Sequence, residues 1–235
     1  YWPADVSDAR IVDTSPYGEM QAPDASGISL PAGFVSRVLA RTGQAVAVTG
    51  YVWHVAPDGG ACFTSSDGGW VYVSNSEVGG ARGGASALRF DRSGSITAAY
   101  SVLSGTSINC AGGATTRGTW LSCEEHTTGL VYECDPQRPS NGVARPALGA
   151  YKHEAAAEDP VTGYVYLTED DPLGRLYRFV PTTPGDLSRG ALYAAAVGRH
   201  LPMDCAAIYP VSGGSEAIET ALKLARAYHI ARGQP

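Results

Sequence analysis

The stretch Gly69–Asn75 reads GWVYVSN, and two later segments repeat its pattern. Gly118–Glu124 reads GTWLSCE and Gly163–Glu169 reads GYVYLTE, so the three glycines stand 49 and 45 residues apart. Each segment joins a turn glycine to aromatic and β-branched residues, which favour a short strand, and ends on a polar or acidic residue. A repeat of about 40–50 residues built from short strands is typical of propeller blades. The repeat therefore predicts an all-β propeller in which equivalent residues meet around one axis.

The spacing of turn residues places further strands around each repeated segment. We expect turns at Pro57–Gly60 and Asp91–Gly94, which are rich in turn-forming residues. The expected strands form three blades: Gln44–His54, Gly69–Asn75, Ala85–Asp91 and Ile96–Leu103; then Ser107–Cys110, Thr119–Glu124, Leu130–Cys134 and a weak fourth; then Ala150–Glu154, Tyr164–Thr168, Arg175–Val180 and one near Leu192.

Small residues follow the expected first strand of each blade. They are Val55–Ala56, Ala111–Gly113 and Ala155–Ala157. Small residues suit the crowded channel side of a propeller, so the ends of these strands are expected to face the axis. The side chains presented there are predicted to be His54, Asn109, Cys110, His153 and Glu154.

The two ends of the chain differ from its middle. Residues 1–36 are rich in Pro, Asp, Ser and Gly and predict an irregular arm, whereas residues 37–200 form the partial propeller. In residues 201–235, the segment Ser215–Arg232 has apolar residues at helical spacing and Ser215 as a candidate N-cap. An α-helix is therefore expected to follow the propeller.

Composition limits the classes of function. The chain has 235 residues, 44% of them hydrophobic and 17% charged, and a formal net charge of −6. Without a basic run, nucleic-acid binding is not expected, and no apolar run approaches the roughly 20 residues of a membrane span. The five cysteines form no CxxC motif. Cys123 and Cys134 flank an expected turn at 126–129, so a disulfide between them and two buried free thiols are both open interpretations.

The order of several motifs resembles the PhoX-type alkaline phosphatase family over about residues 24–192. The matching segments are WHVAPDGGA at 53–61, GWVYVSNSE at 69–77, NCAGG at 109–113, GTWLSCEE at 118–125, HEAA at 153–156 and YLTED at 166–170. The resemblance implies a six-bladed propeller with an iron and calcium cluster at its axis that hydrolyses phosphate monoesters. About three blades are present here, which is the N-terminal half of that fold.

The resemblance also implies roles for individual residues. Cys110 would be the thiolate bound to iron, and Glu125 and Glu154 would be carboxylate ligands, with Glu124 and Glu169 as further candidates. Asn75 would contact the phosphate or a metal-bound water, which makes Asn75 and Cys110 the candidate catalytic residues. This donor set is chemically sensible, because a thiolate favours iron and hard Ca²⁺ prefers oxygen ligands.

Simpler interpretations of three of these residues stay open. Glu124 and Glu169 stand at expected hairpin ends, where a carboxylate can accept backbone N–H groups, and Asn75 at a strand end can cap a turn. The chain also departs from the family pattern at Thr116-Arg117, where the family usually has Pro-Trp, and at Ser76, where it often has His.

A second, shorter resemblance covers about residues 202–233. YPVSGGSEAIE at 209–219 is similar to the segment of class III pyridoxal-phosphate aminotransferases in which a turn and a helix N-terminus hold the cofactor phosphate. The Schiff-base lysine and the rest of that fold are missing from the sequence, so aminotransferase activity is the least favoured hypothesis.

The leading hypothesis is a metal-dependent phosphatase or a fragment of one, with a phosphate monoester as substrate. The alternative is a non-catalytic propeller fragment that binds calcium or a protein partner, or that another chain completes. Family resemblance implies a periplasmic or secreted location. Metal binding with turnover would favour the first hypothesis, and metal binding without turnover the second.

Overall fold

The computed structural model describes residues 17–194, which fall into two compact units divided between Arg41 and Thr42. The expected C-terminal helix and the segment similar to aminotransferases lie outside the described residues. Within those residues, no helix is both long and apolar enough to cross a membrane.

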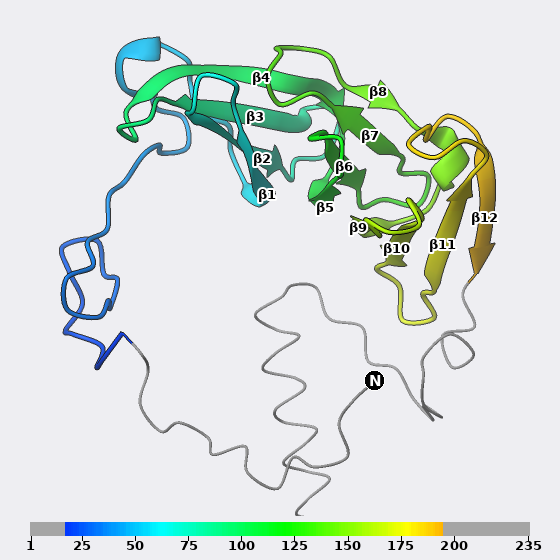
Figure 1. Cartoon of the computed structure of the whole chain (residues 1–235), viewed down its shortest axis with the longest axis horizontal. Helices are drawn as coiled ribbons and strands as arrows, with labels where there is room; N and C mark the ends of the chain where they lie inside the picture. Colours follow the sequence, from blue (N-terminus) through cyan, green and yellow to red (C-terminus); the bar gives the residue numbers. More distant parts are fainter. Residues whose placement is uncertain (1–16, 195–235) are drawn as a thin grey trace, which may run out of the picture. The chain divides into compact units, whose positions relative to one another are not determined.

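The second unit contains three antiparallel sheets of four strands each, which follow one another along an arc (Figure 1). In each sheet the strands are paired in chain order. The first sheet holds β1 Pro57–Thr64, β2 Trp70–Ser76, β3 Gly83–Phe90 and β4 Ile96–Thr106; the second holds β5 Asn109–Ala114, β6 Trp120–Glu124, β7 Val131–Cys134 and β8 Val143–Ala144; the third holds β9 His153–Glu158, β10 Val165–Glu169, β11 Leu176–Pro181 and β12 Gly190–Ala194. This blade-like arrangement confirms the all-β, propeller-like prediction, and the repeated glycine segments supply β2, β6 and β10.

The first strand of each sheet was placed too early by the sequence analysis. Residues 44–54 hold a short 3-10 helix, η1 (Ala47–Thr49), and an isolated bridge between Ala45 and Val52, whereas β1 begins at Pro57 in the segment expected to be a turn. Likewise, β5 and β9 include the small residues that were expected to follow them. A second short 3-10 helix, η2 (Pro146–Leu148), precedes β9.

Close approach between neighbouring sheets explains why these small residues lie inside strands. We call β1, β5 and β9 the inner strands, because they line the concave side of the arc (Figure 1). A Cβ atom added to Gly59 would lie 2.6 Å from the Cα atom of Ala111, and one added to Gly113 would lie 1.7 Å from the carbonyl oxygen of Ala156. Glycine here allows two backbones to approach, so Gly59 belongs to a strand and not to a turn.

Two apolar clusters fill the spaces between the sheets. The cluster between the first and second sheets includes Val71, Val73 and Trp120, and the cluster between the second and third includes Leu121 and Leu167. Adjacent residues of β6 thus serve opposite clusters, as alternation along a strand requires.

This alternation decides the state of the two hairpin cysteines. Cys123 packs in the cluster between the second and third sheets, and Cys134 in the cluster between the first and second. Both are buried free thiols, and in the ladder Cys123 faces Val131 while Cys134 faces Trp120. The disulfide interpretation is therefore wrong.

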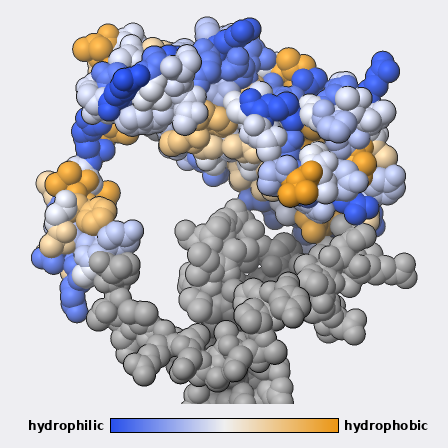
Figure 2. Space-filling model, in the orientation of Figure 1, coloured by the Kyte–Doolittle hydropathy of each residue, from blue (hydrophilic) through white to orange (hydrophobic). Residues whose placement is uncertain are grey.

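The described part of the first unit, residues 17–41, is an irregular segment with one isolated bridge, between Met20 and Pro31. Most of its larger apolar side chains are exposed, Val35 at 91% of its surface, and Figure 2 shows orange residues grouped on this segment. Backbone hydrogen bonds between residues close in the sequence stabilise its turns. The Asp24 carboxylate also accepts the N–H groups of Ser26 and Ile28.

Removing a leucine from the inter-sheet core should cost more than removing one from the surface. Leu167→Ala should lower the free energy of unfolding by about 2–5 kcal/mol, because Leu167 is fully buried and its loss leaves a cavity. Leu173→Ala is the matched control, since Leu173 is 89% exposed and its truncation should change stability by less than about 0.5 kcal/mol. Urea denaturation of both variants checks this, and equal losses would contradict the assigned core.

Acid should destabilise the fold through His54, which precedes β1. Burial lowers the pKa of His54 to about 4, and its Nδ1 atom is buried without a hydrogen-bond partner. Because the unfolded histidine titrates near 6.5, the contribution of neutral His54 is complete above that pH and is lost as the pH falls toward 4. The stability of the wild type relative to His54→Gln should therefore decrease over this window. A difference that stays constant from pH 7 to pH 4 in denaturant titrations would contradict it.

Candidate functional site

Six acidic or thiol residues occupy two equivalent positions in each of the three sheets. The second residue of every inner strand provides one of them, and the first residue after the neighbouring strand provides the other. The pairs are Asp58 and Glu77 in the first sheet, Cys110 and Glu125 in the second, and Glu154 and Asp170 in the third. The repeat read from the sequence thus recurs as a repeat of donor groups.

A shared irregularity of the ladder positions the three inner-strand donors. Each inner strand begins with a residue paired to its neighbour, and the register then shifts by one residue. Such a bulge bends a strand and re-aims a side chain, and bulges are common beside active sites. In every case two residues of the inner strand oppose one residue of its neighbour: Asp58 and Gly59 oppose Asn75, Cys110 and Ala111 oppose Cys123, and Glu154 and Ala155 oppose Thr168.

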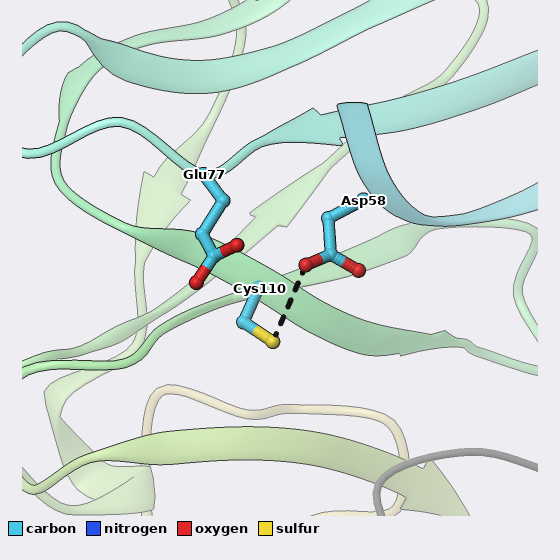
Figure 3. A group of neighbouring side chains, drawn as sticks. All are labelled: Asp58, Glu77 and Cys110. Carbon is cyan, nitrogen blue, oxygen red and sulfur yellow. Dashed lines mark hydrogen bonds between the residues drawn. The ribbon is translucent and has the colours of Figure 1, made fainter. Parts of the chain in front are cut away.

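The first group of donors consists of Asp58, Glu77 and Cys110. One ligand atom from each side chain lies within 4.8 Å of the others, and Figure 3 shows both carboxylates close to the sulfur atom. The Cys110 Sγ atom is 3.6 Å from Asp58 Oδ2, at hydrogen-bonding distance for a thiol donor. Two exposed carboxylates thus flank one buried thiol.

The second group consists of Cys110, Glu125 and Glu154, again with ligand atoms within 4.8 Å of one another. The Cys110 Sγ atom is 3.6 Å from each carboxylate oxygen of Glu154. Cys110 therefore belongs to both groups, and its single S–H can donate to only one of the surrounding carboxylates at a time.

Burial and mutual repulsion raise the pKa of several of these groups. Burial, followed by the neighbouring Asp170 carboxyl, raises the pKa of Glu125 to about 7. Burial also raises the pKa of Glu154 and of Glu77, and the charge of Asp58 contributes in both cases. The pKa of the Cys110 thiol is raised by burial first and then by the surrounding carboxylates. The site thus brings together acidic groups whose charged forms are disfavoured unless a positive charge is present.

The arrangement fits bound cations better than it fits a network of ion pairs. The arginine ion pairs described within residues 17–194 engage other acidic residues, namely Asp67, Glu133, Asp135 and Glu158. A positive ion would relieve the repulsion among the site carboxylates. Carboxylate oxygens suit calcium and the thiolate suits iron, so the donor set agrees with both metals expected from the sequence.

Asn75 lies beside this site but does not present its side chain to it. The side chain is fully buried, and its Nδ2 atom donates to the carbonyl oxygens of Cys110 and Ala111, both at 2.9 Å. Its Oδ1 atom accepts hydrogen bonds from Trp120 Nε1 at 2.9 Å and from Ser122 Oγ at 2.8 Å. These four bonds use the full capacity of a side-chain amide.

Glu124 and Glu169 lie outside both groups, at the ends of their hairpins. The Glu124 carboxylate accepts the backbone N–H groups of Ser107 at 2.8 Å and Leu130 at 3.1 Å. Glu169 Oε2 accepts the N–H of Arg175 at 3.2 Å and the Tyr177 hydroxyl at 2.9 Å. Alternation along the chain directs the next residues, Glu125 and Asp170, toward the site instead.

Asp58, Glu77 and Asp170 were not among the predicted site residues. Asp58 lies in the segment Pro57–Gly60, which was expected to be a turn. The signal that could have found them is the repeat itself, since Glu77, Glu125 and Asp170 each stand seven or eight residues after a repeat glycine. Among the other candidates at the axis, Asn109 and His153 are fully buried and face the interior.

Comparison with known proteins identifies the family of this chain. A family model described as "Alkaline phosphatase PhoX" matches residues 64–131 and 126–202, which together cover more than half of the chain. The comparisons with curated proteins and with solved structures gave no match. The matched residues include all six donors except Asp58, together with the second and third sheets. The chain therefore belongs to the PhoX alkaline phosphatase family.

Proposed function

We propose that this chain is a metal-dependent phosphatase that hydrolyses phosphate monoesters, with iron and calcium as its metals. The observation that carries the proposal is the repeated pair of donors around Cys110 in a member of this family. Export to the periplasm or out of the cell is part of the proposal, by analogy with the family.

The proposed ligands are Cys110, which belongs to both donor groups, and the four carboxylates of those groups: Asp58, Glu77, Glu125 and Glu154. Clustered metal ions, when bound, polarise phosphoryl oxygens and activate an oxygen nucleophile. The bulges orient the donor side chains of the inner strands. Cys110 must release its proton to act as a ligand. Because burial and nearby carboxylates raise the pKa of this thiol, metal binding should release a proton and weaken as the pH falls.

The purified chain should contain iron and calcium and hydrolyse p-nitrophenyl phosphate. Inductively coupled plasma mass spectrometry measures the metals, and chelation should abolish turnover that re-addition of both metals restores. Metal without turnover would favour the alternative of a calcium-binding propeller fragment. A chain that binds neither metal would contradict the proposed site.

Neutralising Glu154 should damage the site without altering its shape. Glu154→Gln should lower both metal content and kcat/KM by more than the roughly 10–100-fold typical of outer-shell partners, because it removes a charged ligand. Asp171→Asn is the matched control, since it removes one negative charge from an exposed residue that lies in neither group. Equal activity of the two variants would exclude Glu154 as a ligand.

The same assay decides the roles of Glu124 and Glu169. If they act only at hairpin ends, Glu124→Gln and Glu169→Gln should lower stability and leave the metal content of the folded protein unchanged, because their oxygens bond N–H and O–H donors. Loss of metal from either folded variant would instead make that residue a ligand.

A further inference from the structure

The Asn75 side chain reaches across from the first sheet to the bulge of the second. It lies on β2 opposite the Asp58–Gly59 bulge of its own sheet, yet its amide bonds to Cys110 and Ala111 on β5. Cys110 and Ala111 are the two bulged residues of β5. A bulge leaves backbone groups without their usual ladder partners, and here the Asn75 amide binds two of those carbonyl oxygens.

Three of its four neighbours fix the orientation of this amide by their chemistry. Carbonyl oxygens can only accept, so the NH₂ group must face Cys110 and Ala111, and the indole Nε1 of Trp120 can only donate, so it must face the amide oxygen. Exchanging the oxygen and nitrogen would break all three contacts. The side chain therefore has a single acceptable orientation and no capacity left for a ligand.

Asn75 is also the last member of a directed chain of buried hydrogen bonds. Thr106 Oγ1 donates to Asn109 Oδ1 at 2.6 Å, and Asn109 Nδ2 donates to Ser122 Oγ at 3.0 Å. Ser122 then donates to Asn75 at 2.8 Å, and all four side chains are buried. Aligned hydrogen bonds polarise one another, which strengthens the last donation to the Cys110 backbone.

We propose that Asn75 is a positioning residue that holds the Cys110 bulge, so that the thiol stays between the two groups of carboxylates. This inference rests on the proposed function, because Cys110 is the thiol of the proposed metal site. It differs from the direct contact with phosphate that the family resemblance implies for Asn75.

The test compares Asn75→Asp with the wild type. Aspartate has the same shape but would turn a carboxylate oxygen toward two carbonyl oxygens, so both bonds to the bulge are lost. In metal-free protein, hydrogen exchange of a peptide covering residues 107–114 should quicken by roughly tenfold or more, with no change in residues 176–181. Unchanged exchange at 107–114 would overturn the proposal.

A second readout uses Co²⁺ as the probe of the thiol. Cobalt bound to Cys110 should give a thiolate charge-transfer band in the near ultraviolet, and Asn75→Asp should weaken that band and lower Co²⁺ affinity by about 10–100-fold. A band and an affinity that match the wild type would overturn the positioning role. A wild type without a band would contradict the proposed function instead, and the exchange experiment would still decide the role of Asn75.

Ser122→Ala keeps the test decisive if Asn75→Asp does not fold. It removes one donor to the Asn75 oxygen but leaves the amide in place, so the same changes are expected at smaller size. Ser86→Ala is the control, because Ser86 is also a buried serine and its side chain bonds to the Tyr51 hydroxyl and not to Asn75 or Cys110. If Ser122→Ala and Ser86→Ala have equal effects, the series of hydrogen bonds through Ser122 does not hold the Cys110 bulge, and the proposal is overturned.

Raising the metal concentration separates positioning from substrate contact. Phosphatase activity lost in Asn75→Asp should return at high metal, with KM for p-nitrophenyl phosphate unchanged. A raised KM that metal does not restore would show that Asn75 contacts the substrate and would overturn the inference.

Discussion

The contact of β5 with β1 on one side and β9 on the other is the constraint on which the rest of this structure depends. The inner strands approach so closely that a Cβ atom at Gly59 or Gly113 would overlap a neighbouring backbone. Small residues on all three strands satisfy this requirement. This close approach brings donors from three separate sheets near one thiol. Side chains on widely spaced strands would lie too far apart.

The bulge converts this approach into a site. In a regular strand, alternate side chains point to opposite faces, and this fixes the direction of the second residue. Two residues opposite one, at the same place in each sheet, re-aim the second residue of every inner strand. The residue after the neighbouring strand supplies the second donor. The same bulge and pair of donor positions, repeated in three sheets, thus produce a set of carboxylate and thiol donors suited to metal ions.

The all-β architecture could be predicted from the sequence because its pattern occurs three times. The bounds of the inner strands could not be predicted in this way. Glycine, aromatic and β-branched residues marked β2, β6 and β10 correctly. Asp58-Gly59-Gly60 has the composition of a turn, and only the backbone contact with Ala111 shows that a strand needs these glycines. The bulge has no motif of its own, and the predicted site residues were Asn75 and Glu169, two residues before Glu77 and one residue before Asp170. Cys110 and Glu154 were predicted at the axis from the ends of their expected strands, and the family resemblance added Glu125. Asn75 was also predicted at the site, but its side chain lies buried behind it.

The division of the core into two apolar clusters has a consequence for how this protein opens. The middle sheet contributes to both clusters, through Trp120 and Cys134 on one side and Leu121 and Cys123 on the other, while the first and third sheets each contribute to one. Fraying of an outer sheet exposes a single cluster, but opening of the middle sheet exposes two at once. In such a row of neighbours the central element has the greatest local stability. Among the three sheets that the structure describes, Cys110 therefore lies on the one whose opening would expose both apolar clusters.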